Sequence, residues 1–570
     1  MVASDELIPS RHRNLLGPAI LLVLVCWLGF NWFSTVSHIV RYYNPLPVSD
    51  SWRVIEDLPA MEARNWSWLW RQHNEHRIVF PELVFAADEL LFSGRQVLPL
   101  IASFSCYLST VILLGCTFWR GVNAPTQIKV CALLLGGIVA GWPLSAFVLG
   151  TPFLLQWTLL QFAVVLGLFT VMSSALFGVS VACGVLATFS SANGILLWPV
   201  LLGVAGYRGA SRGRLIALAL SAVTAVGVFF IGYERPTTAF RASLQHPASP
   251  FGFVLSYLSM PFGVLRHPGF GFVFGLLSLA VWVGCFAGSF RRPTRSISRY
   301  EVLAFGYFSF LLLTATLTSL GRMDLGDPGF SNAKAARYLT FPLLGWTLGI
   351  PLLVAVSLRE QWRFFPPRTI LLVTVAVIAF MQIRLGRWLR TNDNYVSHQQ
   401  WAALGLENGL FDPATIGSVF PEQAFVRHYL PILRTSRKSI FADPAFAFLG
   451  RDFPSVLPEP SRRLEAGGIL RVTHVAGGVS ILGWAAHLAS GGATTILLVD
   501  ESRKIVGLGR HLHAGIPREL SPLLVKEDLV WVGYVNDRYR SKTFIPYLVA
   551  TDRDSASPVA SETSIPAAPR

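Results

Sequence analysis

Long runs of apolar residues dominate this chain and limit what it can fold into. A helix needs about 20 mostly apolar residues to cross a bilayer, and runs close to that length recur from residue 15 to residue 384. Hydrophobic residues make up 52% of the 570 residues and charged residues only 14%, where an average soluble protein has roughly 25% charged residues. The sequence therefore predicts a mainly α-helical, polytopic membrane protein.

Eleven membrane spans are predicted from these runs. They cover residues 15–35, 97–118, 128–149, 153–172, 174–191, 194–207, 215–233, 270–290, 302–320, 339–357 and 368–384. Residues 251–266 are also apolar, but Pro261 interrupts them. Because proline disrupts a helix interior, we interpret this stretch as a re-entrant or interfacial segment.

Arginines in alternate loops give the expected orientation. Arg120, Arg208, Arg291 and Arg359 all lie in loops with almost no acidic residues, and such loops face the cytoplasm. Residues 1–14 are then cytoplasmic, and the long loop 36–96 lies on the outer side. The net charge of +15 is explained by these loops, so no nucleic-acid partner is expected.

An odd number of spans places the C-terminal part of the chain on the outer side. Residues 385–460 carry apolar positions at helical spacing and are expected to form a helical linker region. Short β-rich runs between turn signals follow in 461–551, with a hairpin predicted at Asp500–Lys504. This pattern predicts a small β-sandwich. Residues 552–570, rich in Ser, Ala and Pro, are expected to be disordered.

The loop 36–96 contains the most polar block of the chain, "QHNEHR" at 72–77. Trp66, Trp70, His73 and Arg77 have the spacing of one helical face. We predict a helix that ends near His76, a short bend, and a second helix from 81 to 92, because proline suits the first turn of a helix.

On a continuous helix His73 and His76 share one side, while Glu75 lies almost opposite His73. The spacing of the two histidines lacks the His-Glu-x-x-His pattern of zinc proteases, so no metal site is predicted. Two interpretations remain open for the block. It can form a polar network that joins two interfacial helices, or it can be part of a functional site, because ionisable groups near a bilayer are often functional.

Two further features on the outer side complement this block. Asp50 lies in "NPLPVSDSW", shortly after the first span. The loop 321–338 carries Arg322 and Arg337, and the planar guanidinium of arginine suits phosphate. Each arginine could instead anchor the chain at the membrane interface, and Asp324 and Asp327 could be salt-bridge partners.

The predicted architecture, together with "QHNEHRIVFP", "SSANGILLWP" and "AARY", resembles the GT-C superfamily of integral membrane glycosyltransferases. The resemblance covers about residues 10–390, and 461–551 looks like an outer domain appended to such proteins. It implies a protein of the bacterial inner membrane that moves a sugar from a polyprenyl-phosphate donor to a glycan, lipid or protein acceptor. Membrane lipids would surround it.

The resemblance also implies roles for particular residues. Asp50 matches the position of the general base, and Glu75 is the second candidate. Arg77, Arg322 and Arg337 would hold the lipid phosphate. His73, Asn74 and His76 would contact the donor or the acceptor. A divalent cation held by Asp50 and Glu75 is possible, but no residue pattern requires one.

Two other functions are left open by the sequence. The chain could transport or flip a lipid-linked sugar, which predicts polar groups within the spans and broken helices in matched halves. It could also be a non-catalytic scaffold of envelope assembly, with an outer β-domain that binds a glycan or a protein.

Overall fold

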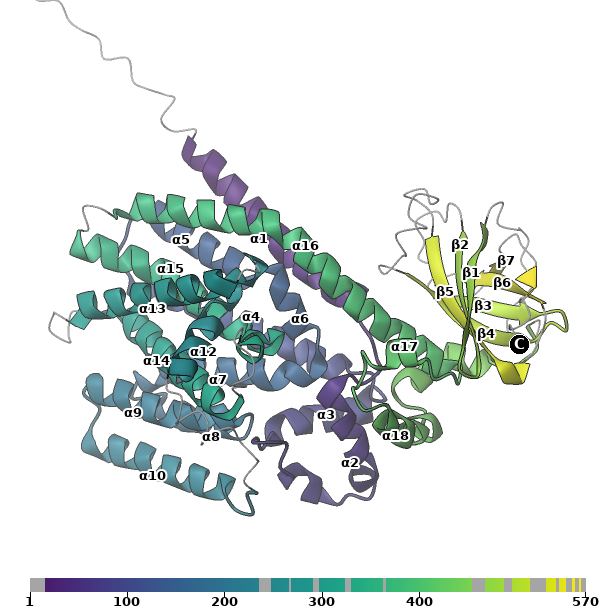
Figure 1. Cartoon of the computed structure of the whole chain (residues 1–570). Helices are drawn as coiled ribbons and strands as arrows, with labels where there is room; N and C mark the ends of the chain where they lie inside the picture. The colour runs from purple at the N-terminus through teal and green to yellow at the C-terminus, as the bar shows by residue number, and fades with distance from the viewer. Residues whose placement is uncertain are drawn as a thin grey trace, which may run out of the picture. The chain divides into compact units, whose positions relative to one another are not determined.

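The computed structural model divides into two compact units, which we describe separately (Figure 1). The first unit comprises 1–40, 69–82 and 100–386, and the second comprises 41–68, 83–99 and 387–570. The structure describes residues 16–234, 248–265, 268–290, 297–322, 330–361, 365–453, 467–485, 495–512, 529–539, 543–549, 556–558 and 563–564.

The first unit is built from helices. They are α1 (Leu16–Arg41), α4 (Val97–Gly121), α5 (Thr126–Ala140), α6 (Ala146–Leu149), α7 (Leu155–Val171), α8 (Phe177–Thr188), α9 (Leu197–Tyr207), α10 (Arg212–Phe229), α12 (Ala248–Leu258), α13 (Pro268–Phe290), α14 (Arg299–Arg322), α15 (Thr340–Glu360) and α16 (Pro367–Glu407). Apolar runs become helices in a membrane because only a helix or a closed barrel satisfies every backbone polar group there.

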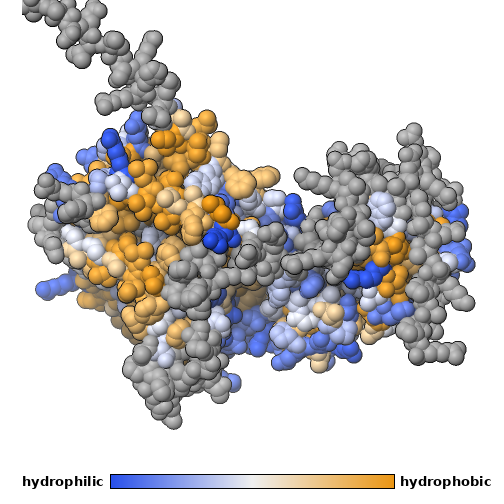
Figure 2. All heavy atoms as spheres, turned by 45° about the horizontal axis from the view of Figure 1, so that its top comes forward, coloured by the Kyte–Doolittle hydropathy of each residue, from blue (hydrophilic) through white to orange (hydrophobic). Residues whose placement is uncertain are grey.

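Within the described part of the chain, nine helical segments are long and apolar enough to cross a membrane. They lie at Gly17–Arg41, Val97–Gly121, Thr126–Leu149, Pro152–Val171, Arg212–Phe229, Gly271–Ser289, Arg299–Arg322, Ala336–Glu360 and Pro367–Gly386. Many large apolar side chains are exposed on these helices, and Figure 2 shows hydrophobic residues spread over the helical part of the chain. The protein is therefore a membrane protein by the length and composition of its helices.

Two of the eleven predicted spans differ from what we expected. The segments predicted at 174–191 and 194–207 form the shorter helices Phe177–Thr188 and Ala192–Tyr207. The turn around Ser191 separates them, and Gly194 allows the close approach there. A Cβ atom on Gly194 would lie 1.8 Å from the carbonyl oxygen of Ala187, so only glycine fits. The apolar run is continuous in sequence, but α8 has only 12 residues.

The stretch predicted to break at Pro261 does break there. Helix α12 ends at Leu258, and a 3-10 helix follows at Met260–Leu265. Phe253, Leu255 and Tyr257 on α12 are fully buried, and α12 packs against α13 and α14. The interruption of the helix agrees with the sequence, and a re-entrant or interfacial position of this stretch stays a prediction.

Helix α16 runs for 41 residues, from Pro367 to Glu407. The domain boundary that we predicted at residue 384 therefore falls inside one helix. The division between the two compact units lies at Gly386 and Arg387, close to the predicted boundary, because the hydrophobic part of α16 ends there.

The second unit contains a helical part with its own apolar core. Its helices are α2 (Trp52–Glu62), the C-terminal part of α3 (Val79–Leu91), the C-terminal end of α16, α17 (Pro413–Ile416) and α18 (Gln423–Ser436). Trp52 and Ile55 of α2 lie in one buried cluster with Leu406, Val419 and Leu433. The first loop and the region after residue 387 are thus joined by apolar packing.

The strands of the second unit form one eight-stranded sheet in the order β1-β2-β5-β4-β3-β6-β7, with β8 paired to β6. The strands are β1 (Gly467–Val475), β2 (Gly478–Ala485), β3 (Thr495–Asp500), β4 (Ile505–His511), β5 (Leu529–Asn536), β6 (Thr543–Val549), β7 (Ala556–Pro558) and β8 (Thr563–Ser564). Neighbouring strands among the described residues pair antiparallel.

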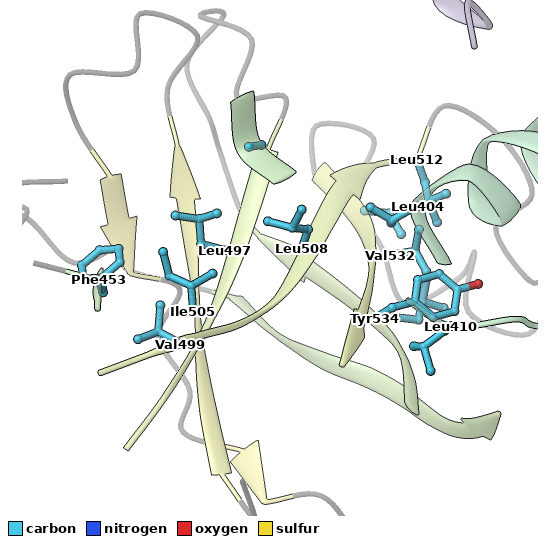
Figure 3. Close-up of a cluster of buried hydrophobic side chains, with 13 residues drawn as sticks. Leu404, Leu410, Phe453, Leu497, Val499, Ile505, Leu508, Leu512, Val532 and Tyr534 are labelled. Atoms are coloured by element: carbon cyan, nitrogen blue, oxygen red, sulfur yellow. The ribbon is translucent and has the colours of Figure 1, made fainter. Parts of the chain in front are cut away.

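Two hydrophobic clusters occupy opposite faces of this sheet. Val532 and Tyr534 of β5 belong to the cluster that includes Leu404 and Leu410 of the helical part (Figure 3). Trp531, which comes just before Val532 in the chain, belongs to the other cluster, because side chains alternate between the faces of a strand. The described strands thus form a single sheet with one face on helices, where we expected a sandwich of two sheets.

The predicted hairpin is present. Asp500 ends β3, and its backbone N–H donates to the carbonyl oxygen of Lys504 at 2.9 Å. The tail prediction was wrong in part, because β7 and β8 belong to residues 552–570 and both pair with β6. An unpaired strand edge offers backbone groups to any extended segment, which composition alone does not predict.

Candidate functional site

The polar block of the first loop folds as a tight turn in the first unit. The backbone N–H of His73 donates to the carbonyl oxygen of His76 at 2.9 Å, and the N–H of His76 donates back at 2.8 Å. Asn74 has φ of +51°, a left-handed conformation that asparagine tolerates better than most residues.

A turn is found where we predicted a helix that ends near His76. The chain is a 3-10 helix only over Trp66–Trp70, and α3 begins at Val79. The helical face proposed for Trp66, Trp70, His73 and Arg77 is therefore wrong. The local preference of the asparagine for a turn decides the conformation, and it brings Glu75 beside His76, which a continuous helix would not allow.

Glu75 forms an ion pair with Arg322, which is the last residue of α14. The Nη2 and Nε atoms of Arg322 donate to Oε1 of Glu75 at 2.5 Å and 3.0 Å. Both side chains are about one-third exposed, at 32% and 35%, so the pair is accessible from solvent. Both are predicted site residues, and the structure brings them together from positions 247 residues apart.

His76 lies against this ion pair and is buried. Its Nε2 atom is 3.4 Å from Oε1 of Glu75. Its Nδ1 atom accepts a hydrogen bond from the backbone N–H of Ala192 at 3.1 Å, one of the N–H groups that the first turn of a helix leaves unpaired. Because Nδ1 accepts, the proton of the neutral ring is on Nε2, the atom that faces Glu75.

The electrostatics agree with a neutral His76. Burial lowers its pKa from 6.5 to about 4, although the carboxylate of Glu75 acts in the opposite direction. Burial raises the pKa of Glu75, but the charges of His76 and Arg322 outweigh it, and the net direction is down. Since His76 is neutral at pH 7, Arg322 is the cation that keeps Glu75 ionised there.

Arg337 lies close to this group. Its positive charge is among those that lower the pKa of His76, and its guanidinium lies 5.1 Å from the ring centre of Tyr338. Tyr338 is buried and contacts Trp157, whose ring meets the ring of His76 edge-on with centroids 5.8 Å apart. The site therefore combines one carboxylate, a neutral imidazole and two arginines with an aromatic wall.

The sequence did not identify this wall. Trp157 and Tyr257 are buried inside apolar helices, and Ser191 lies in the turn before Ala192. The Nε1 atom of Trp157, the hydroxyl of Tyr257 and the hydroxyl of Ser191 are buried and have no hydrogen-bond partner among the described residues. Such groups usually have a partner, so they mark this region as a place for water or a ligand.

Arg77 is bound to the backbone of its own unit, and its predicted phosphate contact stays a prediction. The side chain is 1% exposed. Its Nε and Nη2 atoms donate to the carbonyl oxygens of Phe229 and Ile231 at 2.7 Å and 2.5 Å, and Nη1 donates to that of Trp70. The guanidinium thus caps the C-terminal end of α10, where a positive charge is favourable, and three of its five N–H donors are committed.

His73 and Asn74 lie at the edge of the site. The His73 ring is buried against Phe153, with centroids 5.1 Å apart, and the amide nitrogen of Asn74 lies 3.3 Å from its Nε2 atom. Gln72 fixes the turn from the other side, because its side chain pairs with the backbone of Glu234 at 2.7 Å and 3.0 Å. Asn74 is exposed and remains available to a ligand.

The remaining predicted residues are placed elsewhere. Asp50 belongs to the second unit, in the short 3-10 helix Ser49–Ser51, where the N–H of Ser49 donates to the carbonyl oxygen of Val419. Asp324 and Asp327 lie outside the described residues. Asp50 as the base therefore stays a prediction, and Glu75 is the carboxylate that the first unit places beside His76 and Arg322.

Within the part of the chain that the structure describes, no group of three or more His, Cys, Asp or Glu side chains lies close enough together to hold a metal ion.

Comparison with models of protein families, with curated proteins and with solved structures finds no significant match. The function must therefore be argued from the site itself.

Proposed function

We propose that the chain is a membrane glycosyltransferase. It moves a sugar from a polyprenyl-phosphate-linked donor to an acceptor hydroxyl on the outer, periplasmic side of a bacterial inner membrane. The observation that carries this proposal is the accessible carboxylate of Glu75, held by Arg322 at 2.5 Å beside the neutral ring of His76.

The reaction needs a base, and Glu75 supplies it. The acceptor oxygen attacks the anomeric carbon, the bond from that carbon to the phosphate oxygen breaks, and Glu75 takes the proton of the acceptor hydroxyl. A general base must be within hydrogen-bond reach of that proton, which the exposure of Glu75 allows. The leaving group is the polyprenyl phosphate anion.

The leaving phosphate needs positive charge, and Arg322 and Arg337 can supply it. Arginine binds phosphate through two parallel donors, and the donors of Arg322 are the ones that Glu75 now occupies. When a phosphate takes Arg322, Glu75 loses the cation that lowers its pKa and becomes a stronger base. The donor would thereby activate the site that uses it.

Sugar transfer by the purified full-length protein tests this proposal. The protein in lipid nanodiscs is given radiolabelled polyprenyl-phosphate sugars, and product formation and release of polyprenyl phosphate are both measured. General bases contribute about 10²–10⁴-fold to rates, so Glu75→Gln should lower transfer by about that factor. Glu62→Gln, at an exposed acid of the same loop, is the matched control.

Asp50→Asn is measured beside them and separates the two candidate bases. Loss of transfer in Asp50→Asn with full activity in Glu75→Gln would assign the base to Asp50. Movement of labelled lipid across vesicles without release of polyprenyl phosphate would instead favour a flippase, and would overturn the proposed reaction.

A further inference from the structure

A large apolar groove lies in the first unit, on helices that the polar site does not use. Its volume is about 520 Å³, and its walls come from α5, α13, α15 and α16 and from the 3-10 helix Met260–Leu265. This volume lies within the roughly 300–1,000 Å³ typical of small-molecule sites. No charged side chain is among the described residues that line it.

The groove continues into surfaces that face the bilayer. In the membrane-spanning part of α13 only 22% of the residues are buried, and the same fraction is buried in that of α16. Leu277, Val373 and Val377 line the groove and are 39–55% exposed. A hydrocarbon chain in the surrounding membrane can therefore enter from the side, without passing through a polar layer.

The length of the groove suits one leaflet of a bilayer. From Ile370 to Met381 the wall formed by α16 rises about 16 Å, at 1.5 Å per residue. The hydrocarbon core of a bilayer is about 30 Å thick, so one leaflet accounts for about 15 Å. A single extended acyl chain matches this length.

Two tryptophans that line this groove have indole N–H groups with no accessible surface. The indole Nε1 atoms of Trp142 and Trp346 are buried and have no acceptor among the described residues. An unpaired buried donor costs free energy, so rotation of either ring toward an oxygen acceptor in the groove is favourable. An occupant with such an oxygen is therefore favoured over a plain hydrocarbon. The ester and phosphate oxygens of a phospholipid are such acceptors.

The groove is separate from the polar site. On α15 it uses Leu343, Trp346, Ile350 and Leu353, which recur at helical spacing. Phe341 of the same helix contacts Trp157 of the polar site and lies two residues before Leu343. Residues two apart do not share a helix face, so the two sites lie on different faces of α15.

We propose that this groove is a binding site for one membrane phospholipid. One acyl chain fills the space between α13, α15 and α16, and an oxygen of the glycerol or phosphate region accepts hydrogen bonds from Trp142 and Trp346. This site is distinct from the one assigned to the sugar donor and does not depend on the proposed transfer reaction.

Photolabelling of the full-length protein in vesicles tests the site. The probe is phosphatidylethanolamine with a diazirine in one acyl chain, and labelled peptides are mapped by mass spectrometry. Gly284 lines the groove, and a Cβ atom there would meet nothing within 4 Å. Gly284→Trp can therefore fill the groove without a backbone clash, and Gly284→Leu is a smaller alternative if the first variant does not fold.

Gly227→Trp on α10 is the matched control, because Gly227 is an exposed glycine of another spanning helix with open space around it. We expect Gly284→Trp to lower labelling of the Val373–Met381 segment several-fold and Gly227→Trp to leave it unchanged. In the double variant Trp142→Phe, Trp346→Phe the bound probe should exchange faster with lipid of the surrounding membrane, since both indole N–H donors are lost.

Three results would overturn the proposal. The first is labelling of 373–381 that is equal in the wild type and in Gly284→Trp. The second is labelling of this segment no higher than that of the exposed face of α10, which indicates bulk lipid only. The third is displacement of the probe by polyprenyl phosphate but not by unlabelled phosphatidylethanolamine, which would assign the groove to the donor.

Discussion

At the level of single residues, His76 has its protonation state fixed by one backbone contact. The N–H of Ala192 donates to Nδ1, so a second proton on that atom would remove the bond and charge a buried ring. This geometry and the lowered pKa agree that His76 is neutral at pH 7. It can donate a hydrogen bond to Glu75 or to a ligand, but it is not a cation.

The pH dependence of stability follows from this residue. The pKa of His76 falls from about 6.5 in the unfolded chain to about 4 in the folded chain, so the unfolded state binds a proton first as the pH drops. The contribution of His76 to stability is therefore full above pH 6.5 and decreases between pH 6.5 and 4, by about 3 kcal/mol at the lower limit.

Thermal melting in detergent between pH 7 and 4.5 measures this dependence. His76→Gln should flatten the curve, and His428→Gln, at an exposed histidine of the second unit, should leave it unchanged. Between pH 6.5 and 4.5 Glu75 stays ionised, because its pKa is lowered. Burial raises the pKa of Glu407 to about 7, which changes stability in the opposite direction over the same window, so the difference between the wild type and His76→Gln is the quantity that counts. Curves of equal slope for these two proteins would contradict the neutral His76.

Arg77 gives a second prediction at this scale. Hydrogen bonds to charged groups contribute about 1.5–3 kcal/mol each, and Arg77 donates to three carbonyl oxygens. Arg77→Ala should therefore lower the free energy of unfolding by about 3 kcal/mol or more. Arg77→Lys should restore only part of this loss, since lysine lacks the planar fork.

Tryptophan fluorescence during thermal unfolding checks this loss. Arg212→Ala, at the exposed first residue of the same helix α10, should change stability little. If Arg77→Ala melts like the wild type but fails to bind a polyprenyl-phosphate donor, the structural role of Arg77 is wrong and the predicted phosphate contact is right.

At the level of elements, the contact of α12 with α13 depends on one glycine. A Cβ atom on Gly275 would lie 2.0 Å from the carbonyl oxygen of Leu255, so these two helices approach through a residue without a side chain. Small residues serve this purpose in helix contacts within membranes. The approach holds Tyr257 of α12 beside Tyr338, with ring centres 5.3 Å apart, and so supports the wall of the site.

Gly275→Ala should push α12 and α13 apart and cost about 1–3 kcal/mol, the usual range for overpacking. Gly284→Ala on the same helix has open space and should be neutral or slightly stabilising, because alanine is the better helix former. The melting temperatures of the two variants in the same detergent decide between them. Equal melting temperatures would contradict the close approach.

Elements differ in how well the sequence predicts them. The hairpin at Asp500–Lys504 was predictable because its signals are local, and the break near Pro261 was predictable for the same reason. The division of 174–207 into two short helices depends on Gly194 beside Ala187, which is a contact in space. The strands β7 and β8 were missed because their pairing depends on the open edge of β6.

At the level of the whole molecule, the two units are assembled from segments far apart in the chain. Apolar composition predicts the membrane helices, but it cannot predict that Trp52 packs with Leu406. The candidate site shows the same limit. Its polar members Glu75, His76, Arg322 and Arg337 were identified from residue type, whereas their pairing and the wall of Trp157 and Tyr338 arise from long-range contacts.

The central claim is that the ion pair of Glu75 and Arg322 carries the transfer chemistry and does not serve only to stabilise the fold. A charge exchange separates these roles. The double variant Glu75→Arg, Arg322→Glu can restore an ion pair at the same place, but it moves the carboxylate to the end of α14. A purely structural pair should tolerate this exchange in both stability and activity.

The decisive measurement is sugar transfer by the exchanged double variant, alongside its melting temperature and those of the two single variants. We predict that each single change lowers both transfer and the melting temperature. In the double variant the melting temperature should recover, while transfer stays lower by about 10²-fold or more. Recovery of transfer together with the melting temperature would contradict the account, because the pair would then be structural.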